Sequence, residues 1–182
     1  MSKATKTRKP VTGTVARKAT NKAANKVAQN VSSTERGSLG LTPYIIVKDA
    51  DAAIAFYKQI LNAKEKYRLT DPQGHVGHAE LKIGDGELFL ADEAPAFGAL
   101  APTTIGGTPI RLHLYVADVD DVIRRAQAAG ATVLRPAADQ FYGDRSGMIA
   151  DPFGHQWYLA TRGKIVSPRV MQKRYTAMFT NG

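Results

Sequence analysis

The chain has 182 residues, of which 43% are hydrophobic, which is typical of one or two small globular domains with a sizeable core. It contains no cysteine, which excludes disulfides, thiolate metal sites and a cysteine nucleophile and fits a cytoplasmic protein. Apolar runs all fall short of the roughly 18 residues that would span a bilayer, so we expect no membrane span.

The formal net charge of +9 is concentrated near the start of the sequence. Residues 1–36 contain nine Lys or Arg and one acid, Glu35, whereas the rest of the chain contains 16 basic and 15 acidic residues. Residues 1–38 also lack aromatic residues, so we expect a disordered basic tail that buries no core. Three roles remain open for this tail: a solvated extension, weak contact with nucleic acid or an anionic surface, and an organelle transit peptide.

An internal repeat is the most informative feature. Residues 45–63 and 114–131 each contain a short β-rich run that ends in Val-x-Asp, followed by a stretch with helical spacing of apolar residues. Asp49 and Asp118 occupy equivalent positions, 69 residues apart, and are predicted to cap the two helices. Gly130 is predicted to end the second helix.

Three strand candidates follow each helix. They are residues 65–70, 77–84 and 87–93 after the first helix, and residues 132–136, 146–151 and 156–162 after the second. The repeated order β-α-β-β-β predicts an α+β protein made of two modules. In the last candidate, Trp157 and Leu159 alternate with Tyr158, so Tyr158 should lie on the face opposite the core.

The sequence also predicts the structure of the segments outside these modules. Residues 94–109 are rich in Ala, Gly, Thr and Pro and are predicted to be a linker. Ser167 and Pro168 are typical of a helix start, which predicts a short C-terminal helix. Its apolar residues Met171, Tyr175 and Met178 are expected to form a buried stripe.

Paired βαβββ modules, Val-x-Asp before each helix and the "DPFG" turn before the last strand resemble the vicinal oxygen chelate superfamily. This superfamily includes glyoxalase I, extradiol dioxygenases, fosfomycin-resistance transferases and metal-free bleomycin-resistance proteins. The resemblance covers residues 41–162, and the stretches 139–162 and 167–179 look like an uncharacterised glyoxalase-like branch.

The resemblance implies a curved mixed sheet around a cavity and a homodimer. It gives three parts: a basic tail at 1–38, a glyoxalase-like domain at 39–165 with modules 41–93 and 110–162, and a C-terminal helical extension at 166–182.

In the metal-dependent members, the resemblance implies one ligand from the first strand of each module, commonly His or Gln, and one Glu from each last strand. These positions fall on Thr42, Phe89, Arg111 and Tyr158. None is a usual ligand, and Arg111 would repel a divalent cation. We therefore expect no metal cofactor at these four positions.

The alternation along the strands predicts which side chains line the cavity. They are polar, aromatic and partly cationic: Tyr44, His78, Glu80, Arg111, His113, Tyr115 and Tyr158. Such walls suit a small ligand with aromatic or anionic groups.

A loop at 139–147 has two interpretations. With Gly143 as a hinge it places Tyr142 and Arg145 over the ligand. Alternatively, Asp144 pairs with Arg145 and Phe141 fills the core.

Several of these residues also have other interpretations. His78, Glu80 and His113 would form a displaced divalent-metal site of two histidines and one carboxylate, or a simple His–Glu pair. Arg111 would bind the ligand or pair with Glu80. His75 is expected in solvent, and His155 is expected to satisfy backbone groups of its own turn.

The sequence leaves two principal functions. The first is a glyoxalase/bleomycin-resistance-like protein that binds a small molecule in a cavity without the usual metal ligands. The second is a lyase, isomerase or dioxygenase of the same superfamily that uses the His/Glu cluster, with or without a divalent metal. In a third interpretation the basic tail carries the function, through nucleic acid.

Overall fold

The computed structural model describes residues 40–180. The predicted basic tail at 1–38, with its expected contacts to nucleic acid or anionic surfaces, lies outside this range. Within it, none of the helices has the length and hydrophobicity needed to cross a bilayer.

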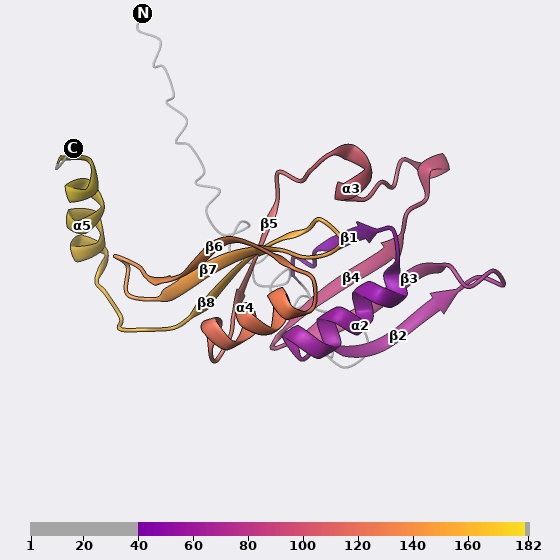
Figure 1. The fold of residues 1–182 in the computed structure, drawn as a ribbon, viewed down its shortest axis with the longest axis horizontal. Helices are drawn as coiled ribbons and strands as arrows, with labels where there is room; N and C mark the ends of the chain where they lie inside the picture. The colour runs from indigo at the N-terminus through magenta and orange to yellow at the C-terminus, as the bar shows by residue number, and fades with distance from the viewer. Residues whose placement is uncertain (1–39, 181–182) are drawn as a thin grey trace, which may run out of the picture. The chain divides into compact units, whose positions relative to one another are not determined.

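Each of the two modules folds as one four-stranded mixed sheet with one long helix (Figure 1). Module 1 consists of β1 (Tyr44–Val47), α2 (Ala50–Leu61), β2 (Lys64–Thr70), β3 (Val76–Ile83) and β4 (Gly86–Asp92). Module 2 consists of β5 (Arg111–Tyr115), α4 (Val119–Ala128), β6 (Thr132–Asp139), β7 (Arg145–Ala150) and β8 (Gln156–Thr161). The predicted α+β fold with two βαβββ modules is confirmed.

The sheets have the same strand order, β1-β4-β3-β2 and β5-β8-β7-β6. In each sheet the first strand runs parallel to the last, and the other neighbours are antiparallel. Tyr44 lies opposite Phe89 in module 1, and His113 lies opposite Tyr158 in module 2. The repeat of 69 residues in the sequence is therefore also a repeat in strand register.

The two helices begin where the sequence predicts. Asp49 Oδ1 accepts a hydrogen bond from the Ala52 amide at 2.9 Å, and Asp118 Oδ1 accepts one from the Asp121 amide at 3.0 Å. The residue that caps the C-terminus of α2 was not predicted. It is Asn62, which adopts the left-handed conformation with φ of 54°. Asn tolerates this conformation better than most side chains, so it ends a helix much as Gly does.

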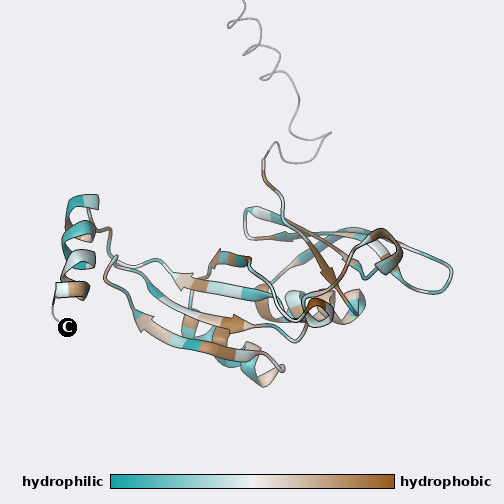
Figure 2. Ribbon diagram, turned by 90° about the horizontal axis from the view of Figure 1, so that it is seen from above, coloured by the Kyte–Doolittle hydropathy of each residue, from teal (hydrophilic) through white to brown (hydrophobic). Residues whose placement is uncertain are grey.

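Alternation along the strands separates a core face from an open face, as banded colouring shows in Figure 2. The core face of module 1 includes Val47 and Leu81, both fully buried against α2, and that of module 2 includes Trp157 and Leu159. Tyr158 lies between the last two and projects to the open face, as the sequence predicts.

A buried carboxylate joins the modules. Asp151, in the turn before β8, is 4% exposed. Its Oδ1 accepts hydrogen bonds from the Phe153 and His155 amides at 3.0 and 2.9 Å. Its Oδ2 accepts from the Tyr57 hydroxyl at 2.7 Å and from the Trp157 indole at 2.8 Å. Since Tyr57 belongs to α2, this single side chain connects module 1 to module 2.

His155 forms a second connection. Its Nε2 lies 2.9 Å from the Ile46 carbonyl oxygen in β1, and the residue is buried. The expectation that His155 satisfies groups of its own turn is therefore wrong for the side chain, because sequence alone did not place β1 beside this turn.

The predicted linker contains two short helices, η1 (Pro95–Phe97) and α3 (Pro102–Ile105). Two other expectations need correction. Strand β6 continues past Pro136 to Asp139, with register irregularities beside this proline, where a missing amide is tolerated.

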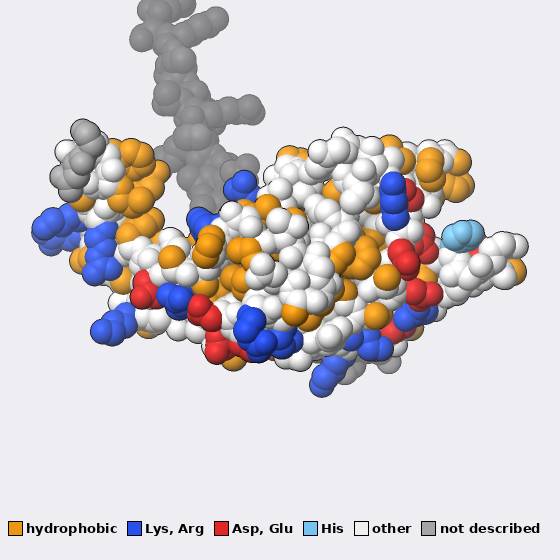
Figure 3. All heavy atoms as spheres, viewed as in Figure 1, with side chains coloured by type: hydrophobic (Ala, Val, Ile, Leu, Met, Phe, Trp, Pro, Cys, Tyr) orange, Lys and Arg blue, Asp and Glu red, His pale blue; other side chains and the backbone are white. Residues whose placement is uncertain are grey.

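The second concerns α5 (Pro168–Thr180), which begins as predicted but buries no residue. Tyr175 is 48% exposed and Met178 is 62% exposed, and hydrophobic and basic side chains lie together on its surface (Figure 3). The helix approaches the modules through Phe141, whose ring is 5.6 Å from that of Tyr175 and whose carbonyl accepts from Arg174 at 2.8 Å.

We predict that Asp151→Ala lowers the free energy of unfolding by about 3 kcal/mol, because it leaves the Tyr57 hydroxyl and the Trp157 indole buried without an acceptor. Asp71→Ala is a matched control, because Asp71 accepts from Gln73 and His75 amides in an equivalent but exposed turn. Its expected loss is about 1 kcal/mol. Chemical denaturation measures both values, and equal losses would contradict the connecting role of Asp151.

Candidate functional site

The open face of module 2 carries one row of side chains across all four strands. The strand register places His113 (β5), Tyr158 (β8), Met148 (β7) and Arg135 (β6) side by side. Cross-strand neighbours share a face of the sheet, so these side chains project together. We call this row, with Arg111 and Tyr115 of β5, the open face of module 2.

Aromatic rings cover the centre of this face. The His113 and Tyr158 rings are stacked, with centroids 5.0 Å apart and an interplanar angle of 16°. The Tyr115 ring lies 4.7 Å from that of His113 at 60°. The Arg135 guanidinium carbon lies 4.9 Å from the centroid of the Tyr158 ring, within range of a cation–π interaction.

Three hydroxyls meet beside Arg135, and we call them the hydroxyl cluster: Tyr142, Ser146 and Tyr158. The Ser146 Oγ lies 3.1 Å from the Tyr142 Oη and 3.0 Å from the Tyr158 Oη, and the two tyrosine hydroxyls also form a hydrogen bond with each other. The structure therefore brings together two residues predicted from separate segments, Tyr142 and Tyr158.

Electrostatics distinguish the two tyrosines of the cluster. Partial burial acts to raise the pKa of Tyr158, but hydrogen bonds from Ser146 and Tyr142 and the charge of Arg135 outweigh it and lower that pKa below its usual value. Burial and the bond to Tyr158 raise the pKa of Tyr142. Tyr158 is therefore the preferred site for a negative charge.

Sequence reasoning missed Ser146 and Arg135. Ser146 is fully buried, and the Arg135 Nε and Nη2 atoms are buried without a hydrogen-bond partner in the structure. The alternation of β7 and β6 could have placed both on the face of Tyr158, but the irregular register of β6 near Pro136 obscures its period.

A cavity of about 290 Å³ adjoins this face. Tyr115 and Tyr142, both predicted site residues, line it together with Arg162 and Lys164. The Arg162 guanidinium carbon lies 3.9 Å from the centroid of the Tyr115 ring. The cavity thus combines aromatic surfaces with two basic side chains and one carboxylate, that of Asp144.

The turn at 140–144 forms one wall of the cavity. Gly143 has φ of 106°, and a side chain there would collide with the Lys164 carbonyl. Asp144 accepts hydrogen bonds from the Tyr115 hydroxyl and the Gly163 amide, both at 3.1 Å. The turn is therefore bonded to the segment that follows β8.

The predicted Asp144–Arg145 pair is wrong, because Arg145 binds Asp120 at 2.7 Å and Asp139 at 3.2 Å. Phe141 is only half-buried and packs against Tyr142 and Tyr175 outside the core, so the prediction that it fills the core is also wrong. A role for Arg145 over a ligand stays a prediction.

The predicted site residues of module 1 form a separate network. The His78 Nδ1 lies 3.0 Å from the Tyr44 hydroxyl, and its Nε2 lies 3.5 Å from Glu80. Glu80 accepts from the Tyr67 hydroxyl at 2.6 Å and pairs with Lys66 at 2.9 Å. These bonds, that from Tyr67 above all, lower the pKa of Glu80.

The predicted pairing of Arg111 with Glu80 is therefore wrong. Arg111 donates instead to the Gln156 Oε1 at 3.2 Å, since Gln156 is its cross-strand partner. Between residues 40 and 180, no hydrogen bond, ion pair or ring contact joins the network around Glu80 to the open face of module 2.

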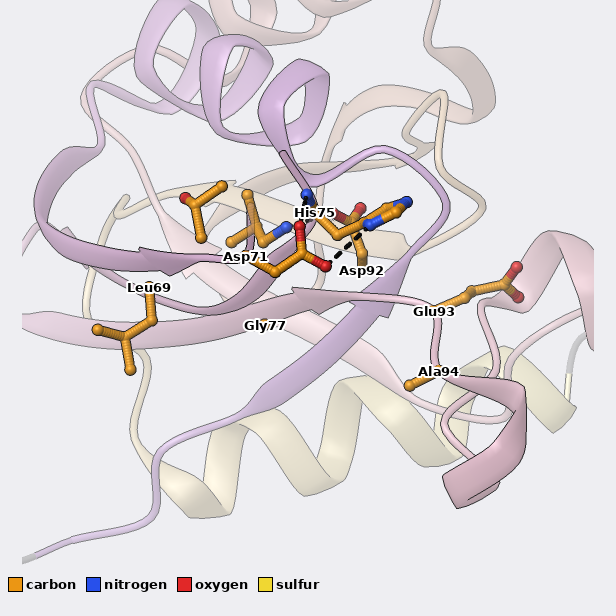
Figure 4. A pocket seen from close by; sticks show the side chains of 9 residues that line it. Leu69, Asp71, His75, Gly77, Asp92, Glu93 and Ala94 are labelled. Atoms are coloured by element: carbon orange, nitrogen blue, oxygen red, sulfur yellow. Dashed lines mark hydrogen bonds and ion pairs between the residues drawn. The ribbon is translucent and has the colours of Figure 1, made fainter. Parts of the chain in front are cut away.

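A larger hollow of about 500 Å³ contains the acids Asp71, Asp92 and Glu93 (Figure 4). Asp92 accepts from the Ala50 and Val76 amides, both at 2.7 Å, and so fixes the start of α2. Asp71 pairs with His75 at 3.0 Å, a residue whose side chain is 69% exposed, as expected for a solvated histidine. These carboxylates serve local structure.

The four positions that the resemblance assigns to metal ligands hold unsuitable side chains for a cation. Thr42 and Phe89 offer no strong donor, and Arg111 adds positive charge, which leaves the Tyr158 phenol. In residues 40–180, moreover, no three His, Asp or Glu side chains converge in a group fit for a metal ion, so His78, Glu80 and His113 do not form the displaced site.

The model of the Glyoxalase/Bleomycin resistance protein/Dioxygenase superfamily matches residues 39–159. The chain belongs to this superfamily. It is 41% identical over 145 residues to the uncharacterised protein Rv0887c of Mycobacterium tuberculosis, covering 78% of this chain and 84% of that protein. An uncharacterised Mycobacterium bovis protein, Mb0911c, is also 41% identical, with 93% of its length covered.

Solved structures share the fold. TioX from Micromonospora sp. ML1 superposes with a TM-score of 0.55 at 27% identity, covering 70% of this chain and 100% of that chain. A glyoxalase-related enzyme from Fulvimarina pelagi has a TM-score of 0.54 at 20% identity, covering 72% and 99%, a likeness of fold alone.

We predict that this superfamily member, purified without chelator, contains far less than one divalent ion per chain. The four positions that the resemblance assigns to metal ligands lack carboxylate and imidazole donors. Plasma mass spectrometry of the full chain measures the content of zinc, nickel, manganese and iron. About one equivalent of any of them, lost on substitution of Tyr158, would overturn the prediction.

Proposed function

We propose that the chain binds a small, planar, anionic molecule at the open face of module 2 and its adjoining cavity, without a metal ion. The charge distribution supports this most directly. Between residues 40 and 162, Arg111, Arg135 and Arg162 have no carboxylate partner, whereas the other four arginines each form an ion pair. Among these three arginines, Arg162 lines the cavity, where its charge favours an acidic ligand.

The aromatic side chains support a planar ligand. Tyr115 is 43% exposed, and its ring centroid lies 4.7 Å from that of His113 and 3.9 Å from the Arg162 guanidinium carbon. A flat ring or conjugated system could stack on these surfaces while its acidic group contacts a guanidinium group. The cavity beside Tyr115 has room for such a ligand.

We also propose that the chain forms a homodimer through the open face of module 1. That face exposes large apolar and aromatic side chains: Tyr44 at 50%, Tyr67 at 46% and Leu69 at 61%. All three share the face of His78, since Leu69 lies opposite it and the two tyrosine rings are within 6 Å. A two-fold symmetric partner would bury this surface.

The ligand class is tested with three probes that share one ring system: 2-naphthoate, 2-naphthamide and 2-naphthylmethylammonium. We predict that only naphthoate binds measurably by isothermal calorimetry. Arg162→Gln should weaken it roughly tenfold, because it removes a charge-assisted hydrogen bond beside the cavity. Arg124→Gln, in an exposed ion pair on α4, should leave affinity unchanged. Equal binding of all three probes would refute the proposed ligand class.

The dimer is tested by light scattering coupled to gel filtration. We predict that the full chain elutes at twice the 19.6 kDa mass of one chain and that Leu69→Glu converts it to a monomer. Gln127→Glu, at an exposed position on α4, serves as the control for an added charge. A wild-type monomer at micromolar concentration would argue against the interface.

A further inference from the structure

The hydroxyl cluster is closed to other partners in the structure. Tyr142, Ser146 and Tyr158 each bond to the other two, and none of these hydroxyls has another hydrogen-bond partner in the described part of the chain. Loss of one proton from Tyr158 would leave its oxygen accepting from both Tyr142 and Ser146. The cluster can therefore hold a negative charge without losing a hydrogen bond to that oxygen.

Arg135 supplies the opposite charge. Its guanidinium lies over the Tyr158 ring, and two of its nitrogens are buried without partners. A buried, unpaired guanidinium is costly unless an anion lies nearby. No carboxylate forms an ion pair with Arg135 within residues 40–180, so Tyr158 is the group whose ionisation would compensate it.

We propose that Tyr158 is a proton-exchanging residue: its phenol gives up a proton, and the resulting charge is held by Tyr142, Ser146 and Arg135. The position is central, because Tyr158 lies between His113 and Met148 in the row across the sheet. A ligand stacked on this face would meet the phenol directly. Ionisation of Tyr158 does not depend on the proposed ligand.

The groups around Tyr158 favour this charge from every neighbouring strand. Arg135 faces it from β6, His113 stacks on it from β5, and Ser146 and Met148 approach from β7. Tyr142 faces it from the turn between β6 and β7. None of these side chains is an acid that would repel a tyrosinate.

Other tyrosines differ from Tyr158 in the direction of their pKa shift. Burial raises the pKa of Tyr44 and Tyr57, and the bond to Glu80 raises that of Tyr67. Tyr158 is the one tyrosine in residues 40–180 whose pKa is lowered, in spite of its partial burial.

An ionised Tyr158 could accept a proton from a bound ligand. A ligand with an acidic O–H group, such as a phenol or an enol, would transfer that proton to the tyrosinate oxygen of Tyr158. The O–H electron pair would stay on the ligand oxygen, and a new O–H bond would form on Tyr158. The product anion would lie on a face that carries Arg111 and Arg162.

Tyrosinate absorbance at 295 nm, followed against pH on the full chain without ligand, tests the proposal. The chain has seven tyrosines, so one-seventh of the total change should occur at lower pH than the rest. Tyr158→Phe should remove this early transition. Arg135→Gln and Tyr142→Phe should each move it to higher pH, and Arg135→Lys should move it less than Arg135→Gln.

Tyr175→Phe is the control, because it removes an exposed tyrosine of α5 and should leave the early transition in place. Circular dichroism over the same pH range confirms that each variant stays folded. An early transition that persists in Tyr158→Phe, or its absence from the wild type, would overturn the proposal. Failure of naphthoate binding would not affect it, so the two proposals fail separately.

Discussion

The buried Asp151 carboxylate is the constraint on which the arrangement of the domain depends. It has no cation beside it and relies on four hydrogen bonds, two from its own turn, one from Trp157 and one from Tyr57 of the other module. Burial beside this charge raises the pKa of Tyr57 well above its usual value, so the phenol remains a donor. With the turn fixed, the alternation of β8 directs Trp157 to the core and Tyr158 to the open face. One carboxylate thus contributes both to the packing of the modules and to the start of the strand that carries Tyr158.

The two modules use one backbone plan for different electrostatics. Positions that hold Tyr44 and Phe89 in module 1 hold His113 and Tyr158 in module 2. The charge of Glu80 is neutralised within module 1 by Lys66 and hydrogen-bonded by Tyr67. Module 2 instead accumulates guanidinium groups that no carboxylate neutralises. The arginines without a carboxylate partner therefore lie in one half of the duplicated fold, which is the half where we propose that an acidic ligand binds.

Local rules in the sequence were sufficient for the fold and for the faces of the strands. Helix caps at Asp49 and Asp118 and the alternation around Tyr158 depend on neighbours in the chain, so they could be predicted. The hydrogen-bond partners of side chains across the sheet could not be predicted, because they depend on the register of the strands. Arg111 bonds to Gln156 rather than Glu80 for this reason, and Ser146 joins Tyr158 through a pairing of antiparallel strands that no local pattern specifies.

The side chains at the four ligand positions change the charge that the protein itself carries at the centre of the sheet. In metal-dependent relatives, carboxylates hold a cation, and the cation attracts an oxygen of the ligand. Here a tyrosine stands at one position that the resemblance assigns to a glutamate, and an arginine stands at one that it assigns to His or Gln, so positive charge belongs to the protein itself. Under the proposed function, a guanidinium group would attract an acidic ligand oxygen without a metal, and Tyr158 would exchange a proton with the ligand. The absence of the usual ligands at the four positions is therefore compatible with the proposed recognition of an acidic ligand, because the attracting charge would be carried by protein side chains such as Arg162.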